Sequence, residues 1–153
     1  EELRVVVGWV PDPVAQQKIE GVHFTVDVFC GKDGLPISVV PRERLKVRGS
    51  EVVISRVNMR ERVIRVASDF ASALKEPGPM NIQIIEDKDG SCYVIDVNPR
   101  IAGGTDLTIA AGAPFHVWTL SLLMGTPLDS KHSIQDGMIM TRYYDSVFIP
   151  AVE

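Results

Sequence analysis

The sequence predicts an α+β domain built on a largely antiparallel sheet, with helices packed on one face of that sheet. Two turn signals, at residues 31–34 and 87–90, each lie between segments rich in strand-forming residues, which is typical of β-hairpins. A third segment, residues 58–75, changes to the apolar spacing of an amphipathic helix. Hairpins join antiparallel neighbours, and helices cover the apolar face of such a sheet, so the fold class follows from these observations.

The bulk properties fit one ordinary globular domain. The chain has 153 residues, of which 45% are hydrophobic, and a formal net charge of −4, values typical of a single domain with its own core. The acidic balance argues against a nucleic-acid partner, whose binding surface is basic. No apolar run reaches the roughly 18 residues of a membrane helix, and no signal peptide is visible, so we expect a cytoplasmic protein without a membrane partner.

The two cysteines and the first residue add to this description. Cys30 and Cys92 each lie in an apolar stretch, which predicts free thiols instead of a disulfide framework. The chain opens at Glu1 without a methionine, so we expect a piece of a longer protein. We divide it into an unplaced N-terminal strand segment, residues 1–13, and one main unit, residues 14–150.

Strands dominate the first 57 residues. A buried strand is predicted at 3–10 and ends at the prolines that follow it. Three polar side chains of the segment 22–30 alternate with three apolar ones, which gives this strand one apolar face: His23, Thr25 and Asp27 against Phe24, Val26 and Val28. The remaining predicted strands of this part are residues 14–19, 36–45 and 51–57.

The second part of the chain mixes helices and strands. In the helix predicted at 58–75, Asn58 is the expected N-cap, with Glu61 three residues later as in a capping box. A second hairpin follows across the turn at 87–90. The other predicted elements are hairpin strands at 80–86 and 91–97, helices at 107–111 and 115–124, and a last strand at 138–144.

The second hairpin carries the polar residues that suggest chemistry. Asp96 and Asn98 are two residues apart on a strand and therefore share a face. A two-residue or four-residue turn would pair positions whose numbers sum to 177, which sets Gln83 opposite Val94, on the same face and diagonal to Asp96. A bulge or a three-residue loop would reverse that relation. Oxygen ligands of this kind suit Mg²⁺, which commonly lies between a carboxylate and a substrate phosphate. The alternative is a polar strand face that meets only solvent.

The residues after this strand suggest an anion site. Arg100 follows Pro99 at a fixed corner, where a guanidinium can clamp a phosphate through two hydrogen bonds. Gly103 and Gly104 then precede a helix, and we expect their backbone amides to approach an anion at the helix start. An ordinary turn from strand to helix is the alternative for the two glycines.

Several runs together resemble a known family. The run Met80-Asn81-Ile82-Gln83, followed by Ile95-Asp96-Val97-Asn98-Pro99-Arg100, resembles the metal-binding hairpin of ATP-grasp enzymes. Residues 14–148 are similar to the C-terminal lobe of that superfamily, with the carbamoyl-phosphate synthase large chain and related carboxylate–amine ligases as the nearest type. The resemblance also covers the stretch 24–44, the run Gly103-Gly104 and the segment 110–115.

The resemblance implies a role for each matching residue. Gln83, Asp96 and Asn98 would hold Mg²⁺ (or Mn²⁺) against the phosphates of ATP, and Arg100 would be the catalytic residue that contacts the transferred phosphoryl group or the acyl-phosphate. The base and sugar of ATP would lie against a further set of residues, namely Gln17, Lys18, Ile19 and His23.

The resemblance also implies the reaction and the partners. A phosphoryl group would pass from ATP to a small carboxylate, and an amine would then attack the acyl-phosphate. The N-terminal ATP-grasp lobe, with its glycine-rich loop and lysine, has no counterpart in this sequence, and we expect it in the same or another chain. The chain by itself is therefore expected to bind ATP weakly and not to catalyse ligation.

Three positions depart from the family pattern. Asp96 replaces the usual glutamate, Gln17 stands at a position that is often glutamate, and His23 lies near the usual ribose-binding acid. The alternative function is therefore a degenerate, non-catalytic ATP-grasp module that serves binding or assembly. Among the other polar residues, His116 and His132 are expected to be structural or solvated. Arg42 and Arg44 are expected on a solvated strand face, with the lining of the phosphate cleft as the alternative, and Arg142 is left undecided.

Overall fold

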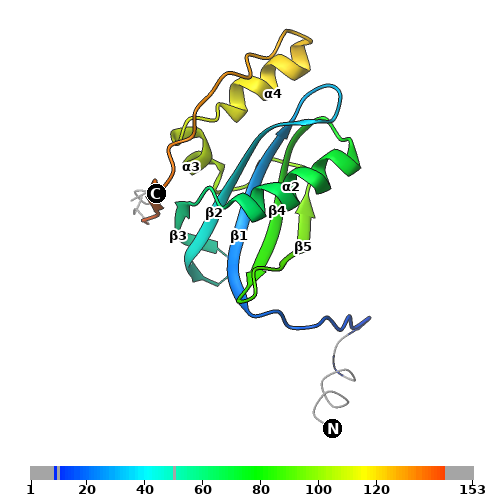
Figure 1. Cartoon of the computed structure of the whole chain (residues 1–153), viewed down its shortest axis with the longest axis vertical. Helices are drawn as coiled ribbons and strands as arrows, with labels where there is room; N and C mark the ends of the chain where they lie inside the picture. The colour runs from blue at the N-terminus through cyan, green and yellow to red at the C-terminus, as the bar shows by residue number, and fades with distance from the viewer. Residues whose placement is uncertain (1–8, 10, 50, 144–153) are drawn as a thin grey trace, which may run out of the picture.

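The computed structural model describes residue 9 and residues 11–49 and 51–143, and its centre is a six-stranded sheet (Figure 1). The strands lie in the order β5-β4-β1-β2-β3-β6, and neighbouring strands are antiparallel. Their bounds are β1 Gly21–Cys30, β2 Pro36–Arg48, β3 Glu51–Val57, β4 Gly78–Asp87, β5 Cys92–Asn98 and β6 Ile139–Thr141.

Helix α2, Glu61–Leu74, covers one face of the sheet, and in Figure 1 it crosses in front of the strands. Its buried residues Val63, Ala67 and Ala71 pack on the alternate residues of β1 and β4 that face the helix. These alternate residues, all less than 4% exposed, are Phe24, Val26, Val28, Met80, Ile82 and Ile84. Period-two alternation therefore places the intervening polar residues of the same strands on the opposite face.

Helices α3, Thr105–Ala110, and α4, Phe115–Met124, lie at the upper end of the molecule in Figure 1. They bring Leu107, Phe115 and Trp118 into a second core cluster with Phe29 and Val40. Phe29 and Val40 belong to the face that α2 leaves open, because they share the alternation of Asp27. This end of the polar face is therefore closed by α3 and α4, and the rest of it is available for a site.

The predicted class, α+β with a largely antiparallel sheet, is confirmed, and the α3–α4 segment adds helices on the second face. The predicted strand at 14–19 is wrong, since these residues form an exposed segment without strand pairing that leads into β1. The predicted strand at 3–10 lies almost wholly outside the described residues. Among the described residues, no helix has both the length and the apolarity needed to cross a membrane.

Two local predictions need correction. Asn58 does not cap α2: the N-cap is Arg60, without a side-chain cap bond, and the Asn58 amide donates to Glu43 at 2.9 Å. The register of the second hairpin also differs. Beside the turn, Glu86 pairs with Cys92, so paired numbers sum to 178 instead of 177, and a bulge that leaves Ile95 unpaired then places Gln83 directly opposite Asp96 instead of Val94. The turn and the bulge each shift the pairing by one position.

Candidate functional site

The open face of the sheet carries a continuous set of polar side chains. The register sets Asn98 beside Asn81, Asn81 beside Asp27, and Gln83 beside Thr25. Because paired residues point to the same side, side chains from four strands share this face. The polar members are Thr25, Asp27, Arg42, Arg44, Asn81, Gln83, Asp96 and Asn98.

Two of the predicted metal ligands, Gln83 and Asn98, bond to a carboxylate oxygen of the third, Asp96. The amide nitrogen of Gln83 donates to Asp96 Oδ2 at 2.8 Å, and the amide nitrogen of Asn98 donates to the same oxygen at 2.6 Å. Arginines hold the two amide oxygens: Arg44 donates to Gln83 Oε1 and Arg100 donates to Asn98 Oδ1, both at 3.4 Å. The structure thus brings together all four residues that the sequence placed at the metal and the transferred phosphate.

The chemistry of this group fits a hard cation. Asp96 is exposed and surrounded by amide donors, so a cation can take their place at the carboxylate. Gln83 and Asn98 then offer oxygen ligands after rotation of their terminal amides. The described residues contain no group of three or more His, Cys, Asp or Glu side chains that could hold a metal. A cation here would therefore keep water or substrate oxygens in its shell, which Mg²⁺ commonly does.

A small pocket adjoins the Asp96 group on the same face. We call it the arginine pocket; it has a volume of about 240 Å³ and is lined by Arg42, Arg44, Arg100 and Arg142, together with Glu51, Gln83, Asn98 and the loop Ala102-Gly103-Gly104. Arg100 enters it from the end of β5, and Arg142 enters from the end of β6. Arg142, which the sequence left undecided, donates to the carbonyl oxygen of Gly103.

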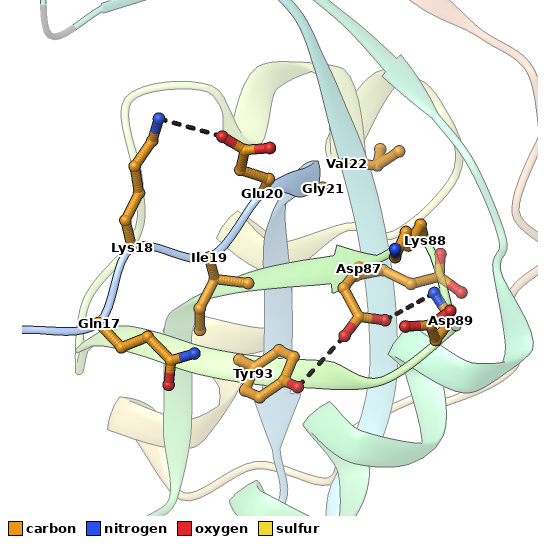
Figure 2. Close-up of a pocket in the computed structure, with 11 residues that line it drawn as sticks. Gln17, Lys18, Ile19, Glu20, Gly21, Val22, Asp87, Lys88, Asp89 and Tyr93 are labelled. Atoms are coloured by element: carbon orange, nitrogen blue, oxygen red, sulfur yellow. Dashed lines mark hydrogen bonds and ion pairs between the residues drawn. The ribbon is translucent and has the colours of Figure 1, made fainter.

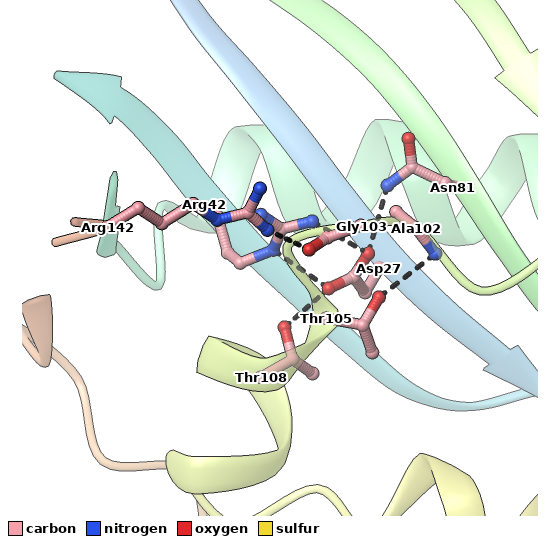
Figure 3. A network of polar contacts seen from close by, with 8 residues as sticks. All are labelled: Asp27, Arg42, Asn81, Ala102, Gly103, Thr105, Thr108 and Arg142. Carbon is pink, nitrogen blue, oxygen red and sulfur yellow. Dashed lines mark hydrogen bonds and ion pairs between the residues drawn. The ribbon is translucent and has the colours of Figure 1, made fainter. Parts of the chain in front are cut away.

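Beneath this pocket lies a buried polar network that the sequence did not predict (Figure 3). Asp27, 1% exposed, accepts hydrogen bonds from Arg42 Nε at 2.8 Å and from Arg42 Nη2 at 3.1 Å. Asn81 Nδ2 donates at 2.9 Å and Thr108 Oγ1 at 2.5 Å. The expected solvated position of Arg42 is therefore wrong, since its side chain is 2% exposed and ion-paired with Asp27.

Gly104 also has a structural role that the sequence did not predict. A Cβ at Gly104 would lie 2.3 Å from Arg42 Nη1, so the loop passes over the guanidinium without a side chain at this position. Helix α3 has six residues and its N-cap is Gly104 without a side-chain cap bond. The expectation that Gly103 and Gly104 present amides to an anion stays a prediction.

A second pocket lies at the opposite end of the polar face, beside the β4–β5 turn (Figure 2). We call it the Tyr93 pocket; its volume is about 610 Å³, and its lining includes Gln17, Lys18, Ile19, Asp87 and Tyr93. In Figure 2 the Ile19 side chain points toward the Tyr93 ring, whereas Lys18 points away and pairs with a neighbouring glutamate at 3.2 Å. The pocket thus combines an apolar wall with a polar rim.

The turn itself is fixed by one carboxylate. Asp87 accepts hydrogen bonds from the backbone of Ser91 and Asp89 and, at 3.2 Å, from the Tyr93 hydroxyl. These bonds, that of Ser91 first, hold the pKa of Asp87 below its usual value. His23 does not line this pocket; it borders a separate hollow of about 480 Å³ with Arg44 and Glu43. The structure therefore groups Gln17, Lys18 and Ile19 and leaves His23 apart.

A sequence match identifies the family of this chain, and solved structures share its fold. None of the curated proteins compared with the chain matches it. The fold is similar to N5-carboxyaminoimidazole synthetase from Staphylococcus aureus complexed with ADP, with a TM-score of 0.68 and 13% identity over 82% of this chain and 36% of that one. It is also similar to biotin carboxylase from Campylobacter jejuni in complex with β-γ-ATP, with a TM-score of 0.66 and 17% identity over 78% and 29% of the two chains.

A third similar structure is the biotin carboxylase domain of 2-oxoglutarate carboxylase from Hydrogenobacter thermophilus, in complex with MgADP, ADP and bicarbonate. Its TM-score is 0.62, with 18% identity over 74% of this chain and 27% of that one. The chain thus spans between 27% and 36% of these three proteins. Residues 10–145 match the model of the family described as "ATP-grasp in the biosynthetic pathway with Ter operon". The chain belongs to this ATP-grasp family, as its resemblance to ATP-grasp enzymes predicted.

Proposed function

We propose that this chain is the ATP- and Mg²⁺-binding lobe of an ATP-dependent carboxylate–amine ligase of the carbamoyl-phosphate synthase type. The observation that carries the proposal is the meeting of Gln83, Asn98 and Arg100 around Asp96 on one open sheet face. The Tyr93 pocket lies on the same face, beside Asp87. Along β4, Asp87 and Gln83 are four residues or roughly 13 Å apart, a span that an extended nucleotide can bridge.

Each part of the face then has a task. The Tyr93 pocket would receive the base and sugar, with Gln17, Lys18 and Ile19 along its rim. Asp96 would take a Mg²⁺ ion, together with the oxygens of Gln83 and Asn98, and the ion would neutralise the phosphate charge during transfer. His23, which borders a neighbouring hollow, would contact the nucleotide only at its edge.

The proposed chemistry uses the arginine pocket. An oxygen of the substrate carboxylate attacks the γ-phosphorus of ATP; the new O–P bond forms as the bond to the β–γ bridging oxygen breaks, and ADP leaves. Arg100 stabilises the charge on the transferred group. An amine then attacks the acyl carbon and phosphate leaves with the former carboxylate oxygen. Arg100 is the residue that we assign to this catalytic role.

A complementary nucleotide-binding lobe, in the same or another chain, completes this site. Losing even two charge-assisted hydrogen bonds, worth on the order of 1.5–3 kcal/mol each, weakens binding about a hundredfold or more. We therefore expect the 153 residues by themselves to bind Mg-ATP in the millimolar range or more weakly, and not to ligate an acid to an amine. Micromolar affinity in calorimetry would contradict this division of the site.

The metal assignment is tested by paramagnetic broadening. With ATP present and Mn²⁺ added in small amounts, NMR signals of the Gln83 and Asn98 side-chain amides should broaden, while that of the Ala67 backbone amide, in the helix on the other face, should not. Asp96→Asn should abolish the broadening, and the matched exposed variant Asp69→Asn should leave it unchanged. Broadening that persists in Asp96→Asn refutes the site.

The complete protein distinguishes a ligase from a non-catalytic lobe. Asp96→Asn should abolish Mg²⁺-dependent ATP turnover with a carboxylate and an amine, because the carboxylate governs charge neutralisation at the phosphates. Asp96→Glu restores the residue usual in the family and should retain turnover. Turnover unaffected by Asp96→Asn would contradict the ligase assignment.

A further inference from the structure

The arginine pocket keeps a positive charge after its neighbouring carboxylates are counted. Four arginines line it; Glu51 is in the lining, Asp27 pairs with Arg42, and Asp96 lies beside the pocket, bonded to Gln83 and Asn98. The formal charge that remains is +1, and a divalent cation at Asp96 would raise it further. Arg44, Arg100 and Arg142 form no ion pair with any described residue. A small concave site lined by cations attracts anions.

The guanidinium groups also enter from different sides. Arg100 follows β5 at one edge of the sheet, Arg44 lies on β2, and Arg142 follows β6 at the other edge. One guanidinium can already hold one carboxylate through two parallel hydrogen bonds. Cations on opposite sides of a pocket therefore fit a ligand that carries a separate anionic group for each side.

Arg44 has an unused donor that fits this description. Its Nε is buried and has no hydrogen-bond partner among the described residues, and its guanidinium donates to Gln83 at 3.4 Å. A buried donor without a partner costs free energy, and a ligand acceptor would remove that cost. Arg42 differs, because Asp27 already holds two of its nitrogens.

The volume limits the size of the ligand. The pocket holds about 240 Å³, roughly the space of eight water molecules in the liquid. This excludes a nucleotide and fits a small acid. The positive charge of the pocket, its arginines on different sides and its small volume together fit a small molecule with two anionic groups.

We propose that the arginine pocket binds a small substrate with two anionic groups. One is the carboxylate to be activated, beside Arg100; the other, a second carboxylate or a phosphate-type group, is held by Arg44 and Arg142. The inference rests on the proposed function for the identity of the reacting carboxylate. The anion preference itself requires neither ATP nor metal, so it can be measured separately from that function.

The test is an NMR titration of the chain without ATP or metal, at constant ionic strength. The probes are acetate, succinate and phosphonoacetate, and the readout is the Nε–Hε signal of Arg44. Succinate, phosphonoacetate or both should bind at least tenfold more tightly than acetate, and the tighter of the two identifies the second group as carboxylate or phosphate-type. Equal affinity for acetate and both dianions would overturn the proposal.

Variants locate the second group. Arg142→Gln should remove the tenfold preference for the dianion and leave acetate binding nearly unchanged, because acetate needs only one side of the pocket. Arg65→Gln, an exposed arginine on α2 over the other face, is the matched control and should keep the preference. Because Arg44→Gln removes the Arg44 signal, binding to that variant is followed at the Arg142 Nε–Hε signal. A preference that survives both Arg142→Gln and Arg44→Gln would refute the assignment, whatever the Mn²⁺ experiment shows.

Discussion

Asp27 and Asp96 lie on the same face of the same sheet, and each accepts hydrogen bonds from amides of neighbouring strands. The two aspartates differ in their exposure and in their hydrogen-bond partners. Asp27 is 1% exposed and is bound to a buried arginine and a threonine of α3, whereas Asp96 is exposed and has only neutral amide donors. The charge of Asp27 is already compensated by the protein, and that of Asp96 is available to a ligand. The same residue type thus serves the fold in one place and chemistry in the other.

The largest difference should be in stability. Asp27→Asn leaves the Arg42 guanidinium buried without a counter-charge, and losing one partner of a buried pair costs about 3–5 kcal/mol. Asp96→Asn removes an exposed charge and should change the free energy of unfolding by less than about 0.5 kcal/mol. Urea denaturation of both variants measures the contrast.

An apolar double variant separates charge from packing. Asp27→Leu combined with Arg42→Met removes both buried charges and should recover much of the stability lost in Asp27→Asn. If the double variant is as unstable as the single one, the network stabilises through its hydrogen bonds to Asn81 and Thr108 instead of through charge compensation.

A smaller effect is expected in the loop above Arg42. Gly104→Ala places a Cβ 2.3 Å from Arg42 Nη1, and Asp27 prevents that guanidinium from moving away. Overpacking of this kind costs about 1–3 kcal/mol. At Gly103 the nearest atom to an added Cβ is Arg142 Nη2 at 3.9 Å, so Gly103→Ala should cost much less. The two alanine variants, compared by thermal unfolding, test whether the loop rests on a fixed arginine.

One further variant tests whether contact with Arg42 is the cause of the Gly104→Ala destabilisation. In the Asp27→Leu, Arg42→Met background the flexible methionine can give way, so the cost of Gly104→Ala should fall. An unchanged cost would mean that the backbone of the loop, and not its contact with Arg42, requires glycine at position 104.

The contrast between the two aspartates also explains what could be predicted from the sequence. Alternation on β5 placed Asp96 and Asn98 on one face, and the motif around them indicated ATP-grasp; both are local features. The same alternation made Asp27 and Arg42 look solvated. Their burial depends on Thr108, 81 residues away from Asp27, and on the helices that close the second face. No local pattern carries that information.

The register of the β4–β5 hairpin was also not predictable from local sequence patterns. Paired numbers sum to 178 beside the turn instead of the predicted 177, and the bulge at Ile95, which no glycine marks, shifts the pairing by one more position. Without the bulge Gln83 would lie opposite Ile95, on the other face from Asp96. The predicted shared face is therefore observed because the two shifts together move the pairing by two positions, which also brings Gln83 directly opposite Asp96.

The smallest expected effect concerns a third carboxylate, Glu43, which lies between the two extremes. Its side chain is 17% exposed and accepts hydrogen bonds from Arg56 at 2.7 Å and Asn58 at 2.9 Å. Burial raises the pKa of Glu43, but these bonds outweigh that effect and hold the pKa below its ordinary value of 4.5. A carboxylate with a lower pKa in the folded state stabilises the fold above the unfolded pKa and loses this contribution as the pH falls.

Glu43→Gln should therefore lower stability at pH 7 and flatten the dependence of the unfolding free energy on pH below about 4.5. Because Arg56 is 42% exposed, the loss at pH 7 should not exceed about 1 kcal/mol. Denaturant titrations from pH 7 down to pH 3 measure both quantities. Glu43 shares the strand face of Phe24, away from Asp96, so Mn²⁺ broadening at Gln83 should be unaffected. An equal slope in the variant and the parent would assign the acid sensitivity to other carboxylates.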